Sequence, residues 1–210
     1  MRRLRISRLA KLLERSIPPI KHPDPNLEQY TTPGELAARL AILAALAVEE
    51  PDMASALDLG SGTCRIAAAL ALVGFSRVVA VELDQRLLPL CLEGLRALGI
   101  GSVVLPVNAR AEALPLPEGR VDVVAMNPPF GVWRRRADTR FLMSAFRLRP
   151  VRVVAILKGG NTQYFERLAR RWGYRVAVEG EYLFPIPASM PKHRSRIRRI
   201  AVEVIVFDRE

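Results

Sequence analysis

The stretch that decides the fold is "MASALDLGSGTCRIAAALALVG", Met53–Gly74. Its first part is a short apolar run that predicts a buried strand, and the run from Cys64 onward predicts a helix that ends at a glycine. Between the two stands "GSG". Gly60 and Gly62 suit a tight turn, because glycine adopts backbone angles that other residues avoid and lets a ligand approach the main chain. This order is typical of the nucleotide-binding half of a doubly wound α/β fold.

The position where a dinucleotide-binding turn carries a third glycine holds Arg65 here. That glycine normally lets the helix pack closely on the strand beside a pyrophosphate, so its absence is unfavourable for NAD or FAD. A smaller nucleoside-type cofactor without phosphates is compatible with the two glycines that are present. A tight turn without any ligand has the same sequence, so this motif needs support from other residues.

Outward from this stretch, strand patterns and helical patterns alternate along the chain. Apolar runs typical of strands follow at residues 77–83, 102–108, 121–126, 151–157, 174–184 and 199–208. Helical patterns separate most of these strands, which predicts parallel βαβ units, whereas the last two strands follow each other directly and predict an antiparallel edge. We therefore expect an α/β, Rossmann-like fold with a seven-stranded, mostly parallel sheet and helices on both faces.

The N-terminal part of the chain has a different character. Residues 1–26 form a basic extension ahead of a single domain at 27–210, and a helix is expected over residues 1–16. The apolar stripe of this helix would consist of Leu4, Leu9, Leu12 and Leu13. After a proline-rich connector, Thr32 is expected to cap a long helix that runs to about Val48, with Pro33 at its first position.

Cysteine usage and hydropathy indicate the compartment. Cys64 and Cys91 are too few for a disulfide framework and lie inside predicted regular structure, so reduced thiols with a packing role are expected. The longest apolar stretch, Leu36–Val48, is too short to cross a bilayer and contains Arg39. No secretory signal and no metal-ligand spacing are visible, so we expect a cytoplasmic protein without a metal site or a membrane partner.

The charge balance of the chain is strongly positive. The formal net charge is +11 in 210 residues, and nearly all of the cations are arginine. Arginine makes planar, bidentate contacts with phosphates and stacks on bases. Such a balance predicts a polyanionic partner, and nucleic acid is the main candidate. A general preference for arginine in the source genome would have the same effect on composition.

Polar residues stand at the ends of the two strands that follow the glycine turn. Glu82 ends the second strand about twenty residues beyond the glycines, where a carboxylate accepts hydrogen bonds from both hydroxyls of a ribose. A helix-capping role is the alternative, although Asp84 suits it better. Asn108 ends the third strand, where its amide can pair with an adenine edge. Together with Gly60 and Gly62 these residues predict a nucleoside site at the carboxyl ends of the strands.

The fourth strand ends in "NPPF", Asn127–Phe130. Proline after Asn127 forces that residue into an extended conformation, and neither Pro128 nor Pro129 has a backbone N–H. The segment is therefore stiff and offers carbonyl acceptors with few donors. The Asn127 side-chain oxygen and the Pro128 carbonyl are suited to a group with two N–H bonds, such as an exocyclic amine. Phe130 would stack on the flat ring that carries the amine.

These motifs carry a family resemblance. "DLGSG", the acid of "VELD", Asn108 and "NPPF" resemble the S-adenosylmethionine-dependent class I methyltransferases that act on an amino group. A finer resemblance covers nearly the whole chain: "LEQYTT", "DLGSG", "MNPPFG" and "PASMPKH" are similar, in this order, to the archaeal and eukaryotic methyltransferase-like family of N6-adenine methyltransferases of ribosomal RNA. Glu82 stands where that family usually has aspartate, and Asn108 also replaces an aspartate.

The resemblance implies roles for individual residues. S-adenosyl-L-methionine would be the cofactor, and Asn127, Pro128, Pro129 and Phe130 would hold the target base as the catalytic segment. The cofactor-binding residues would be Gln29, Tyr30, Thr32, Asp58, Gly60, Gly62, Thr63, Arg65, Glu82, Asn108 and Ala109. The loop that includes His193 resembles the loop of the family that faces the target. The resemblance also implies the strand order 3-2-1-4-5-7-6 for the sheet. A small zinc-binding activator protein often pairs with a sheet edge in this family, and the strand at 102–108 would be that edge.

Several basic segments are candidates for contact with RNA. The predicted RNA-binding residues are Arg134, Arg135, Arg136, Lys158, Lys192, His193 and Arg194. Each basic segment alone also fits a solvated charged face, and only their combination with "NPPF" favours RNA. The expected function is transfer of a methyl group to adenine N6 in structured RNA, of ribosomal origin. The alternatives are methylation of guanine N2 in RNA or of a glutamine amide in a protein, and, in another class, a non-catalytic RNA-binding subunit.

Overall fold

The computed structural model describes residues 6–114, 116–131, 136–187 and 197–210. The strands are β1 (Ser55–Leu59), β2 (Arg77–Glu82), β3 (Val104–Asn108), β4 (Val123–Met126), β5 (Arg152–Lys158), β6 (Tyr174–Pro187) and β7 (Ile197–Arg209). The α-helices are α1 (Ile6–Ser16), α2 (Gly34–Ala45), α3 (Arg65–Leu72), α4 (Leu88–Ala97), α5 (Ala137–Arg147) and α6 (Thr162–Arg170). Short 3-10 helices are η1 (Pro25–Leu27), η2 (Gln85–Leu87) and η3 (Ala111–Ala113).

The strands form one seven-stranded sheet in the order β3-β2-β1-β4-β5-β7-β6, which confirms the predicted topology. β1 to β5 pair in parallel, and β7 runs antiparallel to both β5 and β6. The register places Glu82 directly beside Asn108, and Leu59 beside both Val81 and Met126. The segments that follow β1, β2, β3 and β4 therefore meet at one edge of the sheet, where ligands of open α/β sheets bind.

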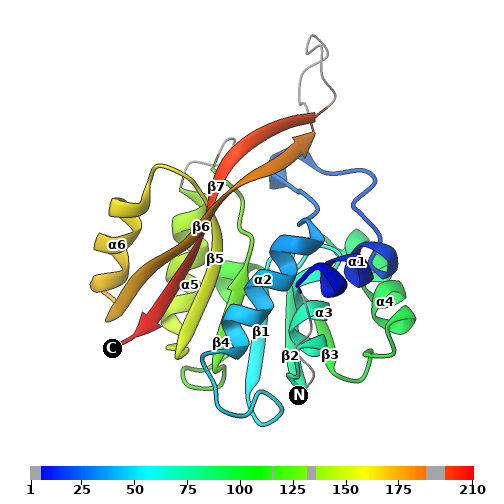
Figure 1. The fold of residues 1–210 in the computed structure, drawn as a ribbon, viewed down its shortest axis with the longest axis horizontal. Helices are drawn as coiled ribbons and strands as arrows, with labels where there is room; N and C mark the ends of the chain where they lie inside the picture. Colours follow the sequence, from blue (N-terminus) through cyan, green and yellow to red (C-terminus); the bar gives the residue numbers. More distant parts are fainter. Residues whose placement is uncertain (1–5, 115, 132–135, 188–196) are drawn as a thin grey trace.

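β6 and β7 form a long ribbon that extends past the ends of the other strands, as the orange and red arrows of Figure 1 show. Their pairing runs from Tyr174↔Arg209 to Pro187↔Ile197, with an irregularity between Val178 and Gly180. Such a bulge bends and twists a strand. The ribbon carries Phe184, which is fully buried, toward the segment that follows β4.

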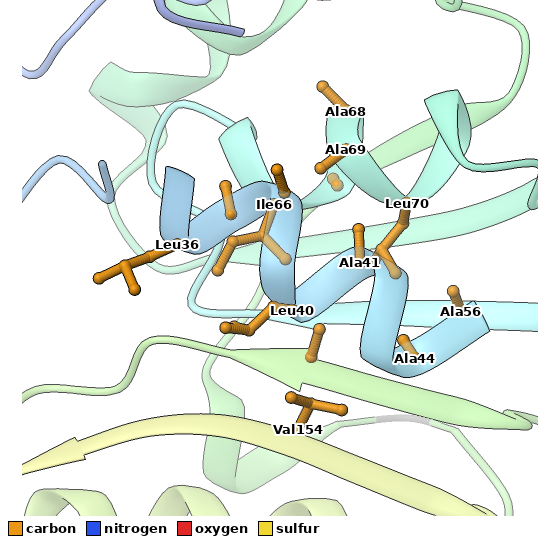
Figure 2. Packing of buried hydrophobic residues seen from close by; sticks show 14 of the residues in the cluster. Leu36, Leu40, Ala41, Ala44, Ala56, Ile66, Ala68, Ala69, Leu70 and Val154 are labelled. Carbon is orange, nitrogen blue, oxygen red and sulfur yellow. The ribbon is translucent and has the colours of Figure 1, made fainter. Parts of the chain in front are cut away.

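Two apolar layers cover the two faces of the sheet. One cluster joins α1, α2, α3 and α4 to one face, and the other joins α5 and α6 to the opposite face. Figure 2 shows how closely α2 approaches α3 in the first layer, with Leu40 and Ala41 among Ile66, Leu70 and the strand residues. Alanine is frequent in both helices, and small side chains allow helices to pack at short distances.

Helix α1 is an integral part of this first layer. Leu9, Leu13 and Ile17 are fully buried, whereas Leu12 is 39% exposed, so the predicted stripe is correct at two of these leucines and wrong at Leu12. The crossing with α2 is close at Gly34, where an added Cβ would lie 2.6 Å from the Ala10 carbonyl oxygen. The domain boundary that we predicted at residue 27 stays a prediction, although α1 shares its core with α2, α3 and α4.

Cys64 and Cys91 are joined by a disulfide, so the expectation of reduced thiols is wrong. Their Cα atoms lie 5.2 Å apart, which is within the usual range for a bridge. The two side chains come from the start of α3 and from α4, which pack in the same layer, and both are fully buried. The disulfide therefore links Cys64, just after the glycine turn, to α4, the helix that follows β2.

Candidate cofactor and acceptor site

A cavity lies at the carboxyl ends of β1, β2 and β4, where the sheet order predicts a ligand site. Three kinds of segment line it: the connector between α1 and α2, the loops that follow the strands, and the start of α5. The lining residues are Ile20, Leu27, Glu28, Gln29, Tyr30, Gly60, Gly62, Val81, Glu82, Leu83, Ala109, Arg110, Ala111, Glu112, Asn127, Pro129, Ala137, Arg140 and Phe141. The cavity thus brings together residues that are far apart in the chain.

The glycine turn follows β1 and closes tightly on β2. The backbone N–H groups of Gly60 and Ser61 both donate to the Val81 carbonyl oxygen, each at 2.9 Å. Gly60 has a φ of +81° and Gly62 a φ of +56°, in the region that favours glycine. A Cβ on Gly60 would also lie 2.9 Å from the Phe141 ring, so the cavity wall needs a glycine here.

Glu82 fixes the geometry of the turn from the neighbouring strand. Its carboxylate accepts a hydrogen bond from the Gly62 N–H at 2.7 Å and another from the Asp84 N–H at 2.8 Å. Burial raises the pKa of this carboxyl, while the backbone N–H groups of Asp84, Gly62 and Leu83 act in the opposite direction. Glu82 therefore holds two loops in place and presents a carboxylate to the cavity.

Asp58 lies behind the turn and is completely buried. One carboxyl oxygen accepts a hydrogen bond from the Ala67 N–H at 2.8 Å, and the other has no hydrogen-bond partner among the described residues. Burial raises the pKa of Asp58 to about 8, which is opposed by the Ala67 N–H and increased further by the nearby Glu82 carboxylate. Asp58 does not line the cavity, so its role toward a cofactor stays a prediction.

The raised pKa of Asp58 predicts a pH dependence of stability. From pH 3.8 to about 8 the folded protein holds a proton that the unfolded chain has lost, so the free energy of unfolding falls as pH rises through this window. The slope approaches about 1.4 kcal/mol per pH unit for one proton. Asp58→Asn removes this titration, and denaturant titrations of both proteins between pH 5 and 9 would measure the difference. Parallel pH profiles for the two proteins would contradict the assignment.

The connector segment between α1 and α2 is bound to the β2 loop through Gln29. The Gln29 side chain donates to the Asp84 carboxylate at 2.9 Å and accepts from the Asp24 N–H at 2.8 Å. Hydrogen bonds from Arg86 hold the pKa of Asp84 well below its usual range, so this carboxylate is charged at neutral pH. Gln29 is buried and lines the cavity, as its predicted role requires.

Thr32 does not cap α2 through its side chain, which corrects the prediction. The helix begins at Gly34, with Pro33 in the capping position and no side-chain hydrogen bond there. The Gly34 N–H donates instead to the Glu14 carboxylate of α1 at 3.2 Å. The Thr32 hydroxyl accepts a hydrogen bond from the Asn127 side-chain amide at 3.0 Å.

Arg65 joins α3 to the N-terminal part of the chain. Its guanidinium donates to the backbone carbonyl oxygens of Thr32 at 2.8 Å and Ile17 at 3.0 Å, and burial lowers its pKa. Arg65 and Thr63 are buried, and neither lines the cavity. The two terminal nitrogens of the residue that replaces the third glycine therefore bind the main chain on either side of the connector, while its Nε is buried without a partner among the described residues.

The two cofactor-binding residues predicted at the end of β3, Asn108 and Ala109, differ in their position relative to the cavity. The Asn108 side-chain amide donates to the carbonyl oxygens of Glu82 at 2.9 Å and Leu83 at 2.8 Å, and the residue is exposed. Ala109, the next residue, lines the cavity. Asn108 thus shapes the loop that follows β2, while the adenine contact that we predicted for it remains a prediction.

The "NPPF" segment forms the wall of the cavity at the end of β4. The Asn127 side-chain oxygen is buried and has no hydrogen-bond partner among the described residues. Pro128 is buried, and Pro129 lines the cavity. Phe130 is only 4% exposed, since its ring stacks against Tyr30, with the ring centroids 5.9 Å apart, and meets Phe184 edge-on at 5.3 Å. Tyr30, and not Phe130, is thus the member of this aromatic pair that lines the cavity.

Residues from α5 that the sequence did not indicate also belong to the site. Arg140 and Phe141 line the cavity, and Arg140 forms an ion pair with Glu112 at 3.6 Å. Helical periodicity alone could place these residues on α5 but not at the cavity. Of the predicted RNA-binding residues, Arg136 and Lys158 are exposed. Arg134, Arg135, Lys192, His193 and Arg194 lie outside the described residues.

The sheet order, the glycine turn and the polar strand ends define a Rossmann-like methyltransferase fold. A family model described as a methyltransferase domain matches residues 56–149. The chain belongs to the family of rRNA N6-adenosine methyltransferases that includes Mettl5, since it is 30% identical to rRNA N(6)-adenosine-methyltransferase Mettl5 of Drosophila melanogaster over 99% of this chain and 98% of the relative.

Two further relatives agree with this placement. The rRNA N(6)-adenosine-methyltransferase metl-5 of Caenorhabditis elegans is 26% identical over 88% of this chain and 89% of its own length. The crystal structure of a Pyrococcus horikoshii protein assigned as an RNA methyltransferase superposes with a TM-score of 0.82 at 29% identity, covering 98% of this chain and 96% of that one. The likeness therefore extends over the whole fold and includes the N-terminal helix.

The part of the chain that the structure describes contains neither a membrane-spanning helix nor a metal-binding group of side chains. None of its helices is both long enough and apolar enough to cross a membrane. Its histidine, cysteine, aspartate and glutamate side chains form no group of three or more that could hold a metal ion.

Proposed function

We propose that the protein transfers a methyl group from S-adenosyl-L-methionine to the N6 amine of an adenosine in small-subunit ribosomal RNA. The observation that carries the proposal is the buried, unpartnered side-chain oxygen of Asn127 at the cavity wall. A buried acceptor without a partner costs about 1–3 kcal/mol, so its presence at a cavity favours a ligand that donates to it. An exocyclic amine is such a ligand.

The cavity has the chemical features that a nucleoside-type methyl donor requires. Gly60 and Gly62 bring the main chain to the cavity wall, and Glu82 lines the cavity together with them. A carboxylate at this position suits the two hydroxyls of a ribose. The apolar side chains of Val81, Leu83 and Ala109 line the same part of the cavity and suit the faces of an adenine.

The acceptor amine is a poor nucleophile, because its lone pair is delocalised into the adenine ring. Hydrogen bonds to the Asn127 side-chain oxygen and the Pro128 carbonyl would draw its two hydrogens out of the ring plane and localise the lone pair on nitrogen. The same acceptors would stabilise the positive charge that develops there in the transition state. Positioning of the amine by the stiff "NPPF" segment contributes a further share of the rate acceleration.

When bound, the methyl donor supplies a sulfonium carbon: the new N–C bond forms as the C–S bond breaks, and sulfur keeps the electron pair of that bond. The amine then carries one proton too many and releases it to solvent. Neither Asn127 nor Pro128 needs to accept that proton. A target adenine that lies in a helix or a stack must first be extruded into the cavity.

Several observations support RNA as the substrate. The net charge is +11, and Arg136 and Lys158 are exposed near the carboxyl ends of the strands. The two curated relatives described above are both called rRNA N(6)-adenosine-methyltransferases. The positive charge favours RNA over the glutamine amide of a protein, and the family favours adenine over guanine.

A small zinc-binding activator protein is the partner that we propose for the edge strand β3. Among the described strands β3 pairs with β2 alone and forms one edge of the sheet, and Leu105 in this strand is 62% exposed. An open strand edge with an exposed leucine is unfavourable unless it is covered. A cytoplasmic location, which was expected from the sequence, stays a proposal.

The proposed function is tested by identifying the product. The purified protein would be incubated with S-adenosylmethionine labelled on its methyl group and an unmodified transcript of small-subunit ribosomal RNA from the source genome. Mass spectrometry of the nucleosides should show labelled N6-methyladenosine. Label in N2-methylguanosine, or label only in glutamine of an added protein fraction, would contradict the proposal.

A further inference from the structure

The amide of Asn127 has two ends with different surroundings. Its nitrogen donates to the Thr32 hydroxyl at 3.0 Å, across 95 positions of the sequence. Its oxygen is buried and has no hydrogen-bond partner among the described residues. The proposed chemistry needs the oxygen to face the acceptor amine, because an N–H of the amide in its place would oppose the N–H groups of the amine.

Thr32 is itself held in place from the opposite side. Its backbone carbonyl accepts a hydrogen bond from Arg65 at 2.8 Å, and Arg65 also binds the Ile17 carbonyl at 3.0 Å. Arg65 is the first residue of α3 and is buried. Thr32 is thus linked by hydrogen bonding, through the Arg65 guanidinium, to α3, the helix that follows the glycine turn.

A second contact joins the same segment to the residues after β4. Tyr30 stacks on Phe130 with an angle of 14° between the ring planes, and Phe184 closes the other side of this aromatic group. Tyr30 and Thr32 therefore contact both ends of "NPPF". The hydrogen bonds of the Thr32 side chain and main chain lead to Asn127 and Arg65, and Thr32 does not line the cavity.

We propose that Thr32 is a positioning residue for Asn127: its hydroxyl binds the amide nitrogen and thereby keeps the amide oxygen directed at the acceptor amine. This inference rests on the proposed function, and it moves Thr32 from the cofactor-binding group, where the sequence placed it, to the acceptor side of the site. Without the hydroxyl, the side-chain nitrogen of Asn127 loses its partner. The amide then gains by rotating or by turning toward another acceptor, and the oxygen no longer faces the amine.

The test is Thr32→Val, which removes the hydroxyl with little change in shape. At saturating S-adenosylmethionine and saturating small-subunit ribosomal RNA transcript, we expect the single-turnover rate to fall about 10- to 100-fold, as for other losses of a precisely oriented group. The Kd for S-adenosylmethionine, measured by calorimetry, should stay within about threefold, because Thr32 contacts the acceptor side. Thr32→Ser restores a hydroxyl and should recover most of the lost rate.

Thr31 provides a matched control in the same segment. Its hydroxyl accepts a hydrogen bond from the Ile20 N–H at 2.9 Å, whereas the Thr32 hydroxyl binds Asn127. Thr31→Val therefore removes an equivalent hydroxyl from the connector, and its single-turnover rate should stay within about threefold of wild type. An equal loss in both valine variants would show a general effect on the connector and would overturn the inference.

Two results at Thr32 itself would also overturn it. One is a Thr32→Val protein with an unchanged rate, and the other is a Kd for S-adenosylmethionine that rises tenfold or more while the rate at saturation is unchanged. The second result would return Thr32 to the cofactor site. The proposed function is judged separately, from the identity of the nucleoside that the wild-type protein methylates. The rate of the Thr32→Val protein is compared with the wild-type rate on that same nucleoside, so this comparison does not depend on which amine receives the methyl group.

Discussion

Replacing Asn127 with alanine should lower the single-turnover rate of methyl transfer by about 100-fold or more, which is the usual loss when one preorganised group that stabilises developing charge is removed. The reason is the position of its amide: the oxygen is buried and unpartnered at the cavity wall, and it is the acceptor best placed for one N–H of the target amine. The Pro128 carbonyl alone would localise the amine lone pair less completely.

The same substitution should leave binding of the methyl donor nearly intact. Asn127 lies at the end of β4, whereas the glycine turn and Glu82 lie at the ends of β1 and β2. We therefore expect the Kd for S-adenosylmethionine to change by less than about fivefold in calorimetry. Asn26→Ala changes an exposed asparagine of the connector and serves as the control. An Asn127→Ala protein with full turnover would rule out the catalytic role of this residue.

Replacing Glu82 with alanine should produce the opposite pattern, with weaker binding of the methyl donor. Glu82 would lose its proposed hydrogen bonds to the ribose, and the Gly62 and Asp84 N–H groups would lose an acceptor that they use at 2.7 Å and 2.8 Å. We expect the Kd for S-adenosylmethionine to rise about 10- to 100-fold, equal to about 1.4–2.7 kcal/mol. The glycine turn should also become less rigid, so the melting temperature should fall.

The measurement is calorimetric titration with S-adenosylmethionine in the absence of RNA. Glu93→Ala removes an exposed carboxylate from α4 with the same loss of charge, and it should bind S-adenosylmethionine like the wild type. A comparable loss of affinity in both alanine variants would point to the overall charge of the protein rather than to Glu82. Unchanged binding in Glu82→Ala would remove Glu82 from the cofactor site.

The parallel pairing of the strands and the location of the cavity could be predicted from the sequence, because both depend on local patterns, whereas the strand order followed from the family resemblance. Alternation of strands and helices fixes parallel pairing, and the carboxyl ends of parallel strands meet at one edge whatever the loops contain. Gly60, Glu82 and Asn127 stand at such ends, so their proximity follows from their positions in the chain. No contact between distant side chains had to be known.

Contacts between distant side chains could not be predicted in the same way. A threonine before Pro33 has the sequence pattern of a helix cap, and only the fold shows that the Thr32 hydroxyl binds Asn127 instead. Arg65 was assigned to the cofactor because of its place in the turn, yet the sequence carries no sign that two carbonyl groups of the connector would meet its guanidinium. The pairing of Cys64 with Cys91 likewise depends on how α3 and α4 pack.

The packing partners of an apolar residue could not be predicted from the sequence, as Phe130 shows. The motif predicts a ring beside the target base, but it does not say which other rings pack on it. Tyr30 and Phe184 come from the connector and from the C-terminal ribbon, and together they leave Phe130 only 4% exposed. Its role as a direct stacking surface remains a prediction, whereas the rings of Tyr30 and Phe141 belong to residues that line the cavity.

The order of the last three strands has a consequence for biosynthesis. The ribosome makes β6 before β7, yet β7 lies between β5 and β6 in the finished sheet. β6 therefore has its native neighbour in the sheet only after residues 197–209 have been made. Its backbone hydrogen bonds to β7, and the packing of Phe184 against Phe130, must wait for that later strand. A nascent chain that still lacks β7 would thus lack the packing that Phe184 provides behind the "NPPF" segment.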